Sequence, residues 1–491
     1  MQKMQFVDPL VTPFGGYGVQ TFQPGDFEAE RHYYPRVLNA SIHPLVRYFL
    51  SLSNERIIAR YCHLHPEVNP LAVTHLLNTV PRHFRWGGTD LFQVETDAGT
   101  RRTVVIETNS SPSGQKSMPL YHEAEEFGGF GRLIMRTFLP SLRRHSLPPG
   151  GLAVLYDKNY MEASGYAAVM AELTGEPVHL VPFFEGDTNL CVGFTGDGVL
   201  QIRKQDAWLP IRAALRYVTQ KPWTRIPPVT RTLMLNPVLV CLAGGRNKML
   251  AAKAYELFNR EHRNSGLQLH TPDTISDLSK EDVPMWVERL GGFGVVKVPY
   301  ANAGQGVYTI TSSTELKEFM TLDFPYDRFI VQSLIGNSNW SSHGDFERLF
   351  HLGTIPDKHG HIYVADLRFM VGVSPEGFYP LAIYARRARS PLVGELDPAM
   401  SSWDILGTNL SIRNEHQGWI SQSERLMLMD NRDFNRLGVA LDDLIEAYIQ
   451  SVMAITAIDT MADSLLTQRG KFRRSFFGIV NSDTALNAEL R

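Results

Sequence analysis

The chain has 491 residues, a formal net charge of −3 from 48 basic and 51 acidic residues, and 43% hydrophobic residues. This is the composition of an ordinary globular protein, and at roughly 150 residues per domain the length predicts two to four domains or subdomains. The balanced charge gives no reason to expect a nucleic-acid or membrane-surface partner. Three scattered cysteines match no metal-ligand spacing and indicate a reducing compartment. With neither a signal-peptide core nor an apolar run of membrane-spanning length, we expect a cytoplasmic protein.

The first half predicts an irregular arm, helices, a hairpin and an α/β unit. Residues 1–35 are rich in glycine, proline and aromatic residues, and helical patterns follow between Leu38 and Leu77. The segments TDLFQVET and RRTVVIETN flank the turn DAGT and predict a β-hairpin. Residues 151–181 read as strand, loop, helix and strand, and 198–218 as a strand followed by a helix. A proline-rich crossing predicts a domain boundary near residue 225.

The second half predicts strand pairs flanked by helices. In chain order we expect a helix at 247–261, strands at 293–301, 307–313 and 327–335, an antiparallel pair at 361–373 and 378–390, and a helical C-terminal part. This order favours an α+β fold over the regular alternation of a barrel.

The stretch RTVVIETNSSPSG, at 102–114, combines a β-branched run with polar residues that could bind a cation. Side chains alternate along a strand, so Glu107 and Asn109 would point to the same face. Their oxygen atoms are the kind of ligand that Mg²⁺ prefers. The alternative is a solvated strand end at Glu107 and a turn that Asn109 begins before Pro112 and Gly114.

Lys297 lies inside the apolar stretch FGVVKVPYA. An unpaired ammonium group would be costly there, so it needs an anionic partner. The glycine-bearing turn NAGQG at 302–306 could place backbone N–H groups over phosphates. Together these features indicate a nucleotide-phosphate site. The alternative is a glycine turn in a hairpin with a lysine that reaches out to water.

Polar residues on later strands complete the candidate set. In DRFIVQSLI, Gln332 and Ser333 could face an adenine edge, although most strands of this type belong to a core. Asp366 and Arg368 share a strand face, and arginines there suit bidentate binding of phosphate or carboxylate. A solvated basic hairpin is the alternative. The following stretch YARRARS adds Arg386, Arg387 and Arg389.

In this order the features resemble the ATP-grasp superfamily, which holds ATP between two α+β subdomains. That family has a lysine at a helix start, a strand lysine before a glycine-rich lid, an adenine-contacting strand, basic residues and an E-x-N motif that binds Mg²⁺. Lys248 in GGRNKMLAAKA resembles the first lysine and Lys297 the second. Here E-x-N precedes the lysines, as in circularly permuted members resembling eukaryotic glutathione synthetase and the glutathionylspermidine synthase type. The resemblance spans most of residues 85–390 as scattered short motifs.

The resemblance implies ATP and Mg²⁺ as cofactors and assigns the site residues. Asp90, which antiparallel pairing would bring close to Glu107, joins Glu107 and Asn109 as a metal ligand. The residues expected at ATP are Lys248, Lys297, Gly304, Gln305, Gly306, Gln332 and Ser333. Arg368 and Arg387 are expected at the transferred phosphoryl group or acyl phosphate. The carboxylate substrate is expected at Ser111, Ser113, Gly114, Asp157, Asn159 and Arg203.

The chain departs from the glutathione synthetase pattern at three positions. Gly88 stands where the family has an arginine two residues before the hairpin aspartate. Gln205 stands at its substrate arginine, with Arg203 and Lys204 nearby. Ala301 stands at its acidic lid ligand. The nucleotide motifs are therefore retained better than the dipeptide-binding ones.

The resemblance implies a circularly permuted ATP-grasp fold with an inserted α/β substrate-binding domain. We expect a metal-bearing part at 1–150, a substrate domain at 151–230, nucleotide-binding subdomains with a lid at 231–420 and a helical segment at 421–491. The expected activity is an ADP-forming carboxylate–amine ligase acting through an acyl phosphate on small molecules. A peptide ligase of the same fold for a natural product, and a nucleotide-binding protein without ligase activity, are the alternatives. The oligomeric state stays open, with a homodimer as one alternative.

Overall fold

The chain folds as a mixed α/β protein with several sheets, as expected, in two compact units. Unit 1 combines residues 1–40 with 113–238, and unit 2 combines 41–112 with 239–491. Each unit joins separated segments, whereas the division expected from the sequence follows chain order. The computed structural model describes residues 18–122, 125–144, 146–184, 191–219, 225–301, 306–344, 347–397, 400–414 and 418–490.

Unit 1 is built on a seven-stranded sheet of order β1-β5-β4-β8-β7-β6, with β9 beside β8. The strand, helix and strand predicted at 151–181 are present as β4, α8 and β5, and β4 and β5 are parallel. Helix α8 packs against both strands and ends at Gly175, whose φ of +70° favours glycine. The strands are β1 (Gln20–Phe22), β4 (Gly151–Tyr156), β5 (Val178–Pro182), β6 (Val192–Phe194), β7 (Leu200–Lys204), β8 (Ala207–Tyr217) and β9 (Leu233–Leu235).

The helix predicted at the end of 198–218 is wrong, because this segment is the strand β8. β8 pairs with β4 on one side and with β7 and β9 on the other, so its C-terminal half is buried. A strand that is buried on both faces reads as an apolar run, and such a run resembles a buried helix in sequence. The helices of this unit are α1 (Ala29–His32), α2 (Pro35–Leu38), α6 (Gly128–Leu133), α7 (Leu139–Arg144) and α8 (Tyr160–Thr174).

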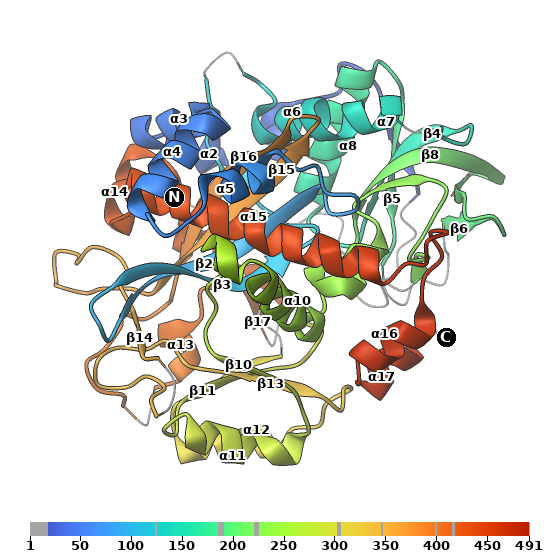
Figure 1. Cartoon of the computed structure of the whole chain (residues 1–491). Coiled ribbons are helices and arrows are strands. Elements are labelled where there is room, and N and C mark those ends of the chain that lie inside the picture. Colours follow the sequence, from blue (N-terminus) through green and yellow to red (C-terminus); the bar gives the residue numbers. More distant parts are fainter. Residues whose placement is uncertain are drawn as a thin grey trace. The chain divides into compact units, whose positions relative to one another are not determined.

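The central sheet of unit 2 has the order β14-β2-β15-β16-β19, with β3 also paired to β2. The predicted hairpin and the predicted antiparallel pair are both confirmed, as β2–β3 and β15–β16. Helix α15 (Leu441–Ser464) packs against β2, β3 and β15 (Figure 1) and covers one face of this sheet. The strands are β2 (Trp86–Thr96), β3 (Arg101–Asn109), β14 (Leu349–His351), β15 (Ala365–Ser374), β16 (Gly377–Arg387) and β19 (Leu426–Met427).

A second sheet of unit 2 has four antiparallel strands in the order β10-β13-β11-β12. It contains the strands predicted around Lys297, at 307–313 and around Gln332. Helix α12 (Ser313–Thr321) packs against β12, and α11 (Val283–Arg289) packs against β13 (Figure 1). The strands are β10 (Thr274–Leu278), β11 (Gly294–Lys297), β12 (Val307–Ile310) and β13 (Phe329–Gln332).

Helices make up most of the remaining part of unit 2. The helices predicted between Leu38 and Leu77 and at 247–261 are present, the latter as α10 (Lys248–Glu261). Among the described residues, no helix has both the length and the apolarity needed to cross a membrane. The other elements are α3 (Pro44–Ser51), α4 (Asn54–Leu64), α5 (Pro70–Asn78), α13 (Ser402–Leu406), α14 (Asn431–Leu437), α16 (Arg474–Val480), α17 (Thr484–Ala488), β17 (Ser411–Asn414) and β18 (Gly418–Ser421), and α9 (Val238–Val240) spans the boundary between the units.

Candidate functional site

The hairpin β2–β3 brings two carboxylates into register. Asp90 lies directly opposite Glu107, as predicted, and Gly88 lies opposite Asn109. The register shifts by one residue between Asp90 and Leu91, so Ile106 is an extra residue in β3. Such a bulge rotates the strand locally. Val105 therefore lies on the face of its partner Leu91, while Glu107, two residues later, lies on the opposite face with its partner Asp90.

Asp90 is held by two arginines of the neighbouring strands. Its carboxylate oxygens each accept a hydrogen bond of 2.6 Å from Arg368, and Arg386 Nη2 lies 3.0 Å from Oδ2. Arg386 also donates from Nε to Asp366 at 3.0 Å. Burial alone would raise the pKa of Asp90, but Arg368 and Arg386 outweigh it and lower the pKa to about 2. Two aspartates and two arginines thus form a neutral buried ladder across β2, β15 and β16.

Lys248, the first residue of α10, lies next to Glu107. Its Nζ is 3.3 Å from Glu107 Oε1 and donates to the carbonyl of Ala301 at 3.2 Å. The Lys248 backbone N–H donates to Pro299 O at 2.9 Å, which ties the helix start to the chain just after β11. Burial would raise the pKa of Glu107, but Lys248, with Lys297 and Arg246, lowers it below its usual value. Glu107 is therefore a partly buried carboxylate that lysine charges keep ionised.

Lys297, the last residue of β11, reaches the same place from the four-stranded sheet. The residue is 5% exposed, so its ammonium group does not reach out to water. Its Nζ donates to the carbonyl of Ile106, the bulged residue of β3, at 3.3 Å. Burial lowers the pKa of Lys297 to about 8, although the Glu107 charge works against this shift. Lys297 is thus a buried cation whose surroundings only partly compensate its charge.

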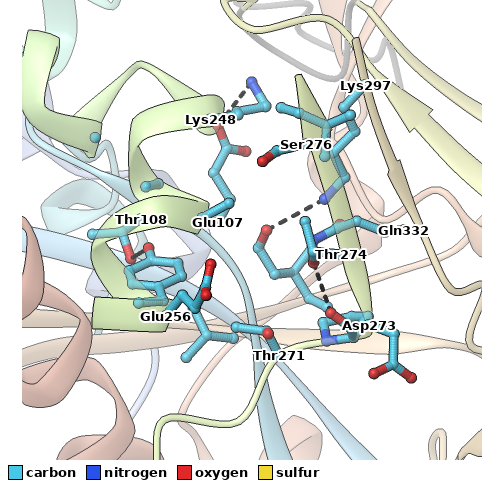
Figure 2. A pocket seen from close by; sticks show the side chains of 18 of the residues that line it. Glu107, Thr108, Lys248, Glu256, Thr271, Asp273, Thr274, Ser276, Lys297 and Gln332 are labelled. Atoms are coloured by element: carbon cyan, nitrogen blue, oxygen red, sulfur yellow. Dashed lines mark hydrogen bonds and ion pairs between the residues drawn. The ribbon is translucent and has the colours of Figure 1, made fainter. Parts of the chain in front are cut away.

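The two lysines and Glu107 line one cavity of about 260 Å³ (Figure 2). Lys248 and Glu107 point toward each other at one end, and Ser276 lies beside them in this view, whereas Lys297 comes from the opposite wall and bonds to the carbonyl of Ile106. Glu256, Thr271 and Asp273 lie toward the other end. Residues of β3, α10, β10, β11 and β13 line this cavity, all within unit 2. Its cationic end suits phosphate groups, and its other end carries hydroxyl and carboxyl groups.

Gln332 and Ser333, the predicted adenine-contacting pair, lie at the end of β13. Gln332 lines the cavity and donates from Nε2 to Thr274 Oγ1 at 2.8 Å. Ser333 is 4% exposed, and its hydroxyl has no hydrogen-bond partner among the described residues. The Ser333 backbone N–H donates to Asp273 O at 2.8 Å, so it is not free to bind a base.

The residues present fit one Mg²⁺ ion better than a larger metal cluster. Within the described residues, no group of three or more His, Cys, Asp or Glu side chains could hold a metal. Proteins usually hold Mg²⁺ through one or two carboxylates, and nucleotide phosphates supply further ligands. Glu107 meets this need, and Asn109 is 5% exposed with an amide nitrogen that lacks a described partner. Asp90 does not fit, because both of its oxygens are bound to arginine.

Close backbone packing shapes the loop after Asn109. The Ser110 N–H donates to Gly245 O at 3.0 Å, and a Cβ on Gly245 would lie 2.6 Å from Ser110 Cβ. A Cβ on Gly88 would lie 2.6 Å from Pro112 Cβ. Pro112 thus fills the space beside Gly88, where a longer side chain would not fit. Ser111 is buried, and its hydroxyl donates to Ser110 O at 2.8 Å.

Three of the predicted substrate residues meet in unit 1. Asn159, with a φ of +49°, donates to Ser113 Oγ and to Tyr217 Oη at 3.2 Å each. The fully buried carboxylate of Glu162, which the sequence analysis did not select, accepts from Ser113 Oγ and Gly114 N at 2.7 Å each and from Gln115 N at 3.0 Å. A glutamate inside an otherwise apolar helical run was the available signal for this residue.

The other predicted site residues are placed elsewhere. Asp157 is fully buried and accepts from Thr219 N at 2.6 Å, and Arg203 is half-buried on β7. Arg387 lies over the Tyr363 ring at 4.6 Å, outside the ladder that Arg386 joins. Gly306 has a φ of +65° just before β12, whereas Gly304 and Gln305 lie outside the described residues. Gln205, in the exposed β7–β8 turn, is no candidate for a buried substrate contact.

Comparisons with protein-family models and with curated proteins give no match. Several solved ATP-grasp structures are similar at low sequence identity. A glutathione synthetase-like effector from Globodera pallida matches with a TM-score of 0.37 and 8% identity over 71% of this chain and 86% of that chain. A RimK domain ATP-grasp protein from Sphaerobacter thermophilus matches with a TM-score of 0.29 and 13% identity over 47% and 89% of the two chains. D-alanyl-alanine synthetase A from Vibrio cholerae matches with a TM-score of 0.28 and 12% identity over 54% of this chain and 95% of that chain. Because these TM-scores are low, the function proposed below rests on the cavity itself.

Proposed function

We propose that the chain is an ATP-dependent carboxylate–amine ligase of the circularly permuted ATP-grasp type, which forms an amide through an acyl phosphate and releases ADP. One observation carries the proposal: Lys248 and Lys297, from different elements, line one cavity with Glu107, and their charges keep this carboxylate ionised. The buried Lys297 and the partly buried Lys248, with one nearby carboxylate, leave an excess of positive charge, and polyphosphate is a ligand that would neutralise it.

In this proposal each lysine exchanges a weak partner for a phosphate oxygen. Lys248 gives up its 3.3 Å contact with Glu107, and Lys297 gives up its 3.3 Å bond to Ile106 O. The two lysines then hold the α- and β-phosphates. Glu107 and Asn109 would hold a Mg²⁺ ion, which would supply positive charge beside the phosphates. The protein contributes mainly positioning and charge compensation.

The buried arginine ladder supports the phosphoryl-transfer end. Arg368 stays proposed for the transferred phosphoryl group, and we add Arg386, which shares its face and its partner Asp90. Asp90 then orients these two guanidinium groups and is not assigned to the metal. Arg387 keeps its proposed role only if it leaves its contact with the Tyr363 ring.

The carboxylate substrate is proposed to bind at the loop and strand ends already described. Ser113, Gly114 and Asn159 form one hydrogen-bonded group with Glu162, and Ser111, Asp157 and Arg203 complete the proposed set. Attack of the substrate carboxylate on the γ-phosphate gives the acyl phosphate, which an amine then converts to the amide with loss of phosphate. The segment with Gly304, Gln305 and Gly306 is proposed to cover the reaction and exclude water.

A nucleotide-binding protein without ligase activity is the second candidate. One observation favours it, namely that Ala301 offers no lid carboxylate and its carbonyl accepts from Lys248. The test is ADP release from ATP and Mg²⁺ against a panel of amino acids and short peptides, with each amine added and omitted. ADP release that depends on the added amine would support a ligase. Tight ATP binding without turnover on any pair would favour the second candidate.

A further inference from the structure

The C-terminal segment 480–487 is bonded to the helix that presents Lys248. Asn247, the N-cap of α10, is fully buried, and its Oδ1 accepts from Leu250 N at 3.3 Å. The other end of the same amide donates from Nδ2 to Asn481 Oδ1 at 3.3 Å. One turn further along α10, Lys253 Nζ donates to Val480 O at 2.7 Å. The segment therefore contacts α10 at its cap and along its first turns.

Asn481 is itself held in one orientation. It is fully buried, and its Nδ2 donates to Asn487 Oδ1 at 3.3 Å. Asn487 returns a bond of 2.7 Å from its Nδ2 to Asn481 O. Because both ends of the Asn481 amide are engaged, its oxygen has a fixed position from which to hold Asn247.

The same segment is also bonded to the four-stranded sheet that carries Lys297. Asp483 accepts from Asp327 N at 3.1 Å and from Arg328 N at 3.0 Å, just before β13. Thr484 donates from its hydroxyl to Asp327 at 2.5 Å. The segment thus contacts α10, which carries Lys248, and the residues just before β13, a neighbour of the strand that carries Lys297, by separate groups of residues.

We infer that Asn481 is a positioning residue for nucleotide binding, which acts through Asn247 to fix the start of α10 and with it Lys248. This inference rests on the proposed function, because it takes Lys248 to be a phosphate ligand. Without the Asn481 amide, the Asn247 side chain loses one of its two partners and the cap becomes free to reorient. Lys248 follows the cap directly, so its ammonium group would be held less firmly over the phosphates.

The test is the affinity for ADP, measured by calorimetry without added metal in full-length protein. Loss of one hydrogen bond should raise the Kd of Asn481→Ala roughly three- to tenfold. In a Lys248→Ala background, Asn481→Ala should have no further effect, whereas in a Lys297→Ala background it should keep its full effect. Thr484→Val is the matched control, since it removes a bond of the same segment to Asp327 and none to α10. It should leave the ADP Kd unchanged.

Asn481→Ser covers the case in which the alanine variant fails to fold, and it should show the same pattern with a smaller effect. Equal effects of Asn481→Ala in both lysine backgrounds, or an equal effect of Thr484→Val, would overturn the inference and leave the segment a structural element only. If Lys248→Ala alone leaves the ADP Kd unchanged, the proposed nucleotide site fails instead. The two failures are therefore distinguishable.

Discussion

Lys297 is held where its own charge is unfavourable. Burial lowers its pKa from 10.5 to about 8, a shift that corresponds to about 3 kcal/mol. Because the folded-state pKa lies below the unfolded one, the unfolded chain binds more protons between these values, and stability rises with pH there. The penalty is thus complete below about pH 8. A residue kept at such a cost is a candidate for function.

Lys297→Met should therefore stabilise the free protein and weaken ADP binding. We expect a gain of roughly 1–3 kcal/mol at pH 7, after loss of the bond to Ile106 O, and a smaller gain near pH 10. Thermal unfolding at both pH values and ADP calorimetry measure the two effects. A variant that loses stability and binds ADP as the wild type does would show that Lys297 has only a structural role.

Glu107→Gln should abolish ATP turnover and leave the fold intact. The amide keeps the shape of the side chain but not the negative charge proposed to hold Mg²⁺. Metal-free ADP should bind at least as well as before, because a carboxylate near the phosphates is removed. Glu256→Gln, an exposed carboxylate that lines the other end of the cavity, is the control and should keep turnover. Full turnover in Glu107→Gln would remove the metal assignment.

At the scale of the strands, the Asp90 ladder is predicted to carry stability. Asp90→Asn leaves Arg368 and Arg386 buried with one carboxylate less, and should lower the free energy of unfolding by about 3–5 kcal/mol. Because the pKa of Asp90 is lowered to about 2 in the folded protein, its ionised form stabilises the fold at pH values above the pKa of the unfolded chain. This stabilisation is lost as the pH falls toward 2. Asp404→Asn removes a half-exposed pair with Arg389 and should cost about 0–1 kcal/mol. Equal unfolding midpoints for the two variants would contradict this difference.

The sequence predicted most strands of this region, but two bulges decide which side chains meet. Counting back from the β15–β16 turn without interruption would place Arg387 on the face of Arg368. The register shift after Met370 places Arg386 there instead. The shift in β3 similarly puts Glu107, and not Ile106, opposite Asp90. Bulges depend on tertiary packing and leave no short-range signal here. The sequence could therefore predict that Glu107 and Asn109 share a face of β3, but not which arginine of β16 shares a face with Arg368.

The sequence also could not predict which side chains are buried. The pattern around Lys297 allowed both a phosphate site and a lysine that reaches water, and the structure removes the second alternative because Lys297 is only 5% exposed. The β8 segment was read as a helix because its pairing on both sides could not be foreseen. Local polar patterns thus selected several residues that line the cavity, whereas long-range pairing decided their surroundings.

At the scale of the molecule, the cavity proposed to bind the nucleotide lies wholly in unit 2, and most of the proposed substrate residues lie in unit 1. ADP should therefore slow amide hydrogen exchange in β3, α10, β11 and β13 and leave β4, α8 and β5 unchanged. Exchange measured by mass spectrometry with and without ADP tests this division. Protection of 151–182 by ADP alone would show that nucleotide binding and substrate binding are not divided in this way.

The most direct test of the ligase proposal is trapping of the acyl phosphate. Full-length protein is incubated with ATP, Mg²⁺, hydroxylamine and a panel of carboxylic acids, and hydroxamate and ADP are measured together. A ligase should form both in equal amounts with at least one acid, and neither should form with Glu107→Gln. ADP release without hydroxamate for any acid, or hydroxamate formation that the Glu107→Gln variant retains, would contradict the proposal.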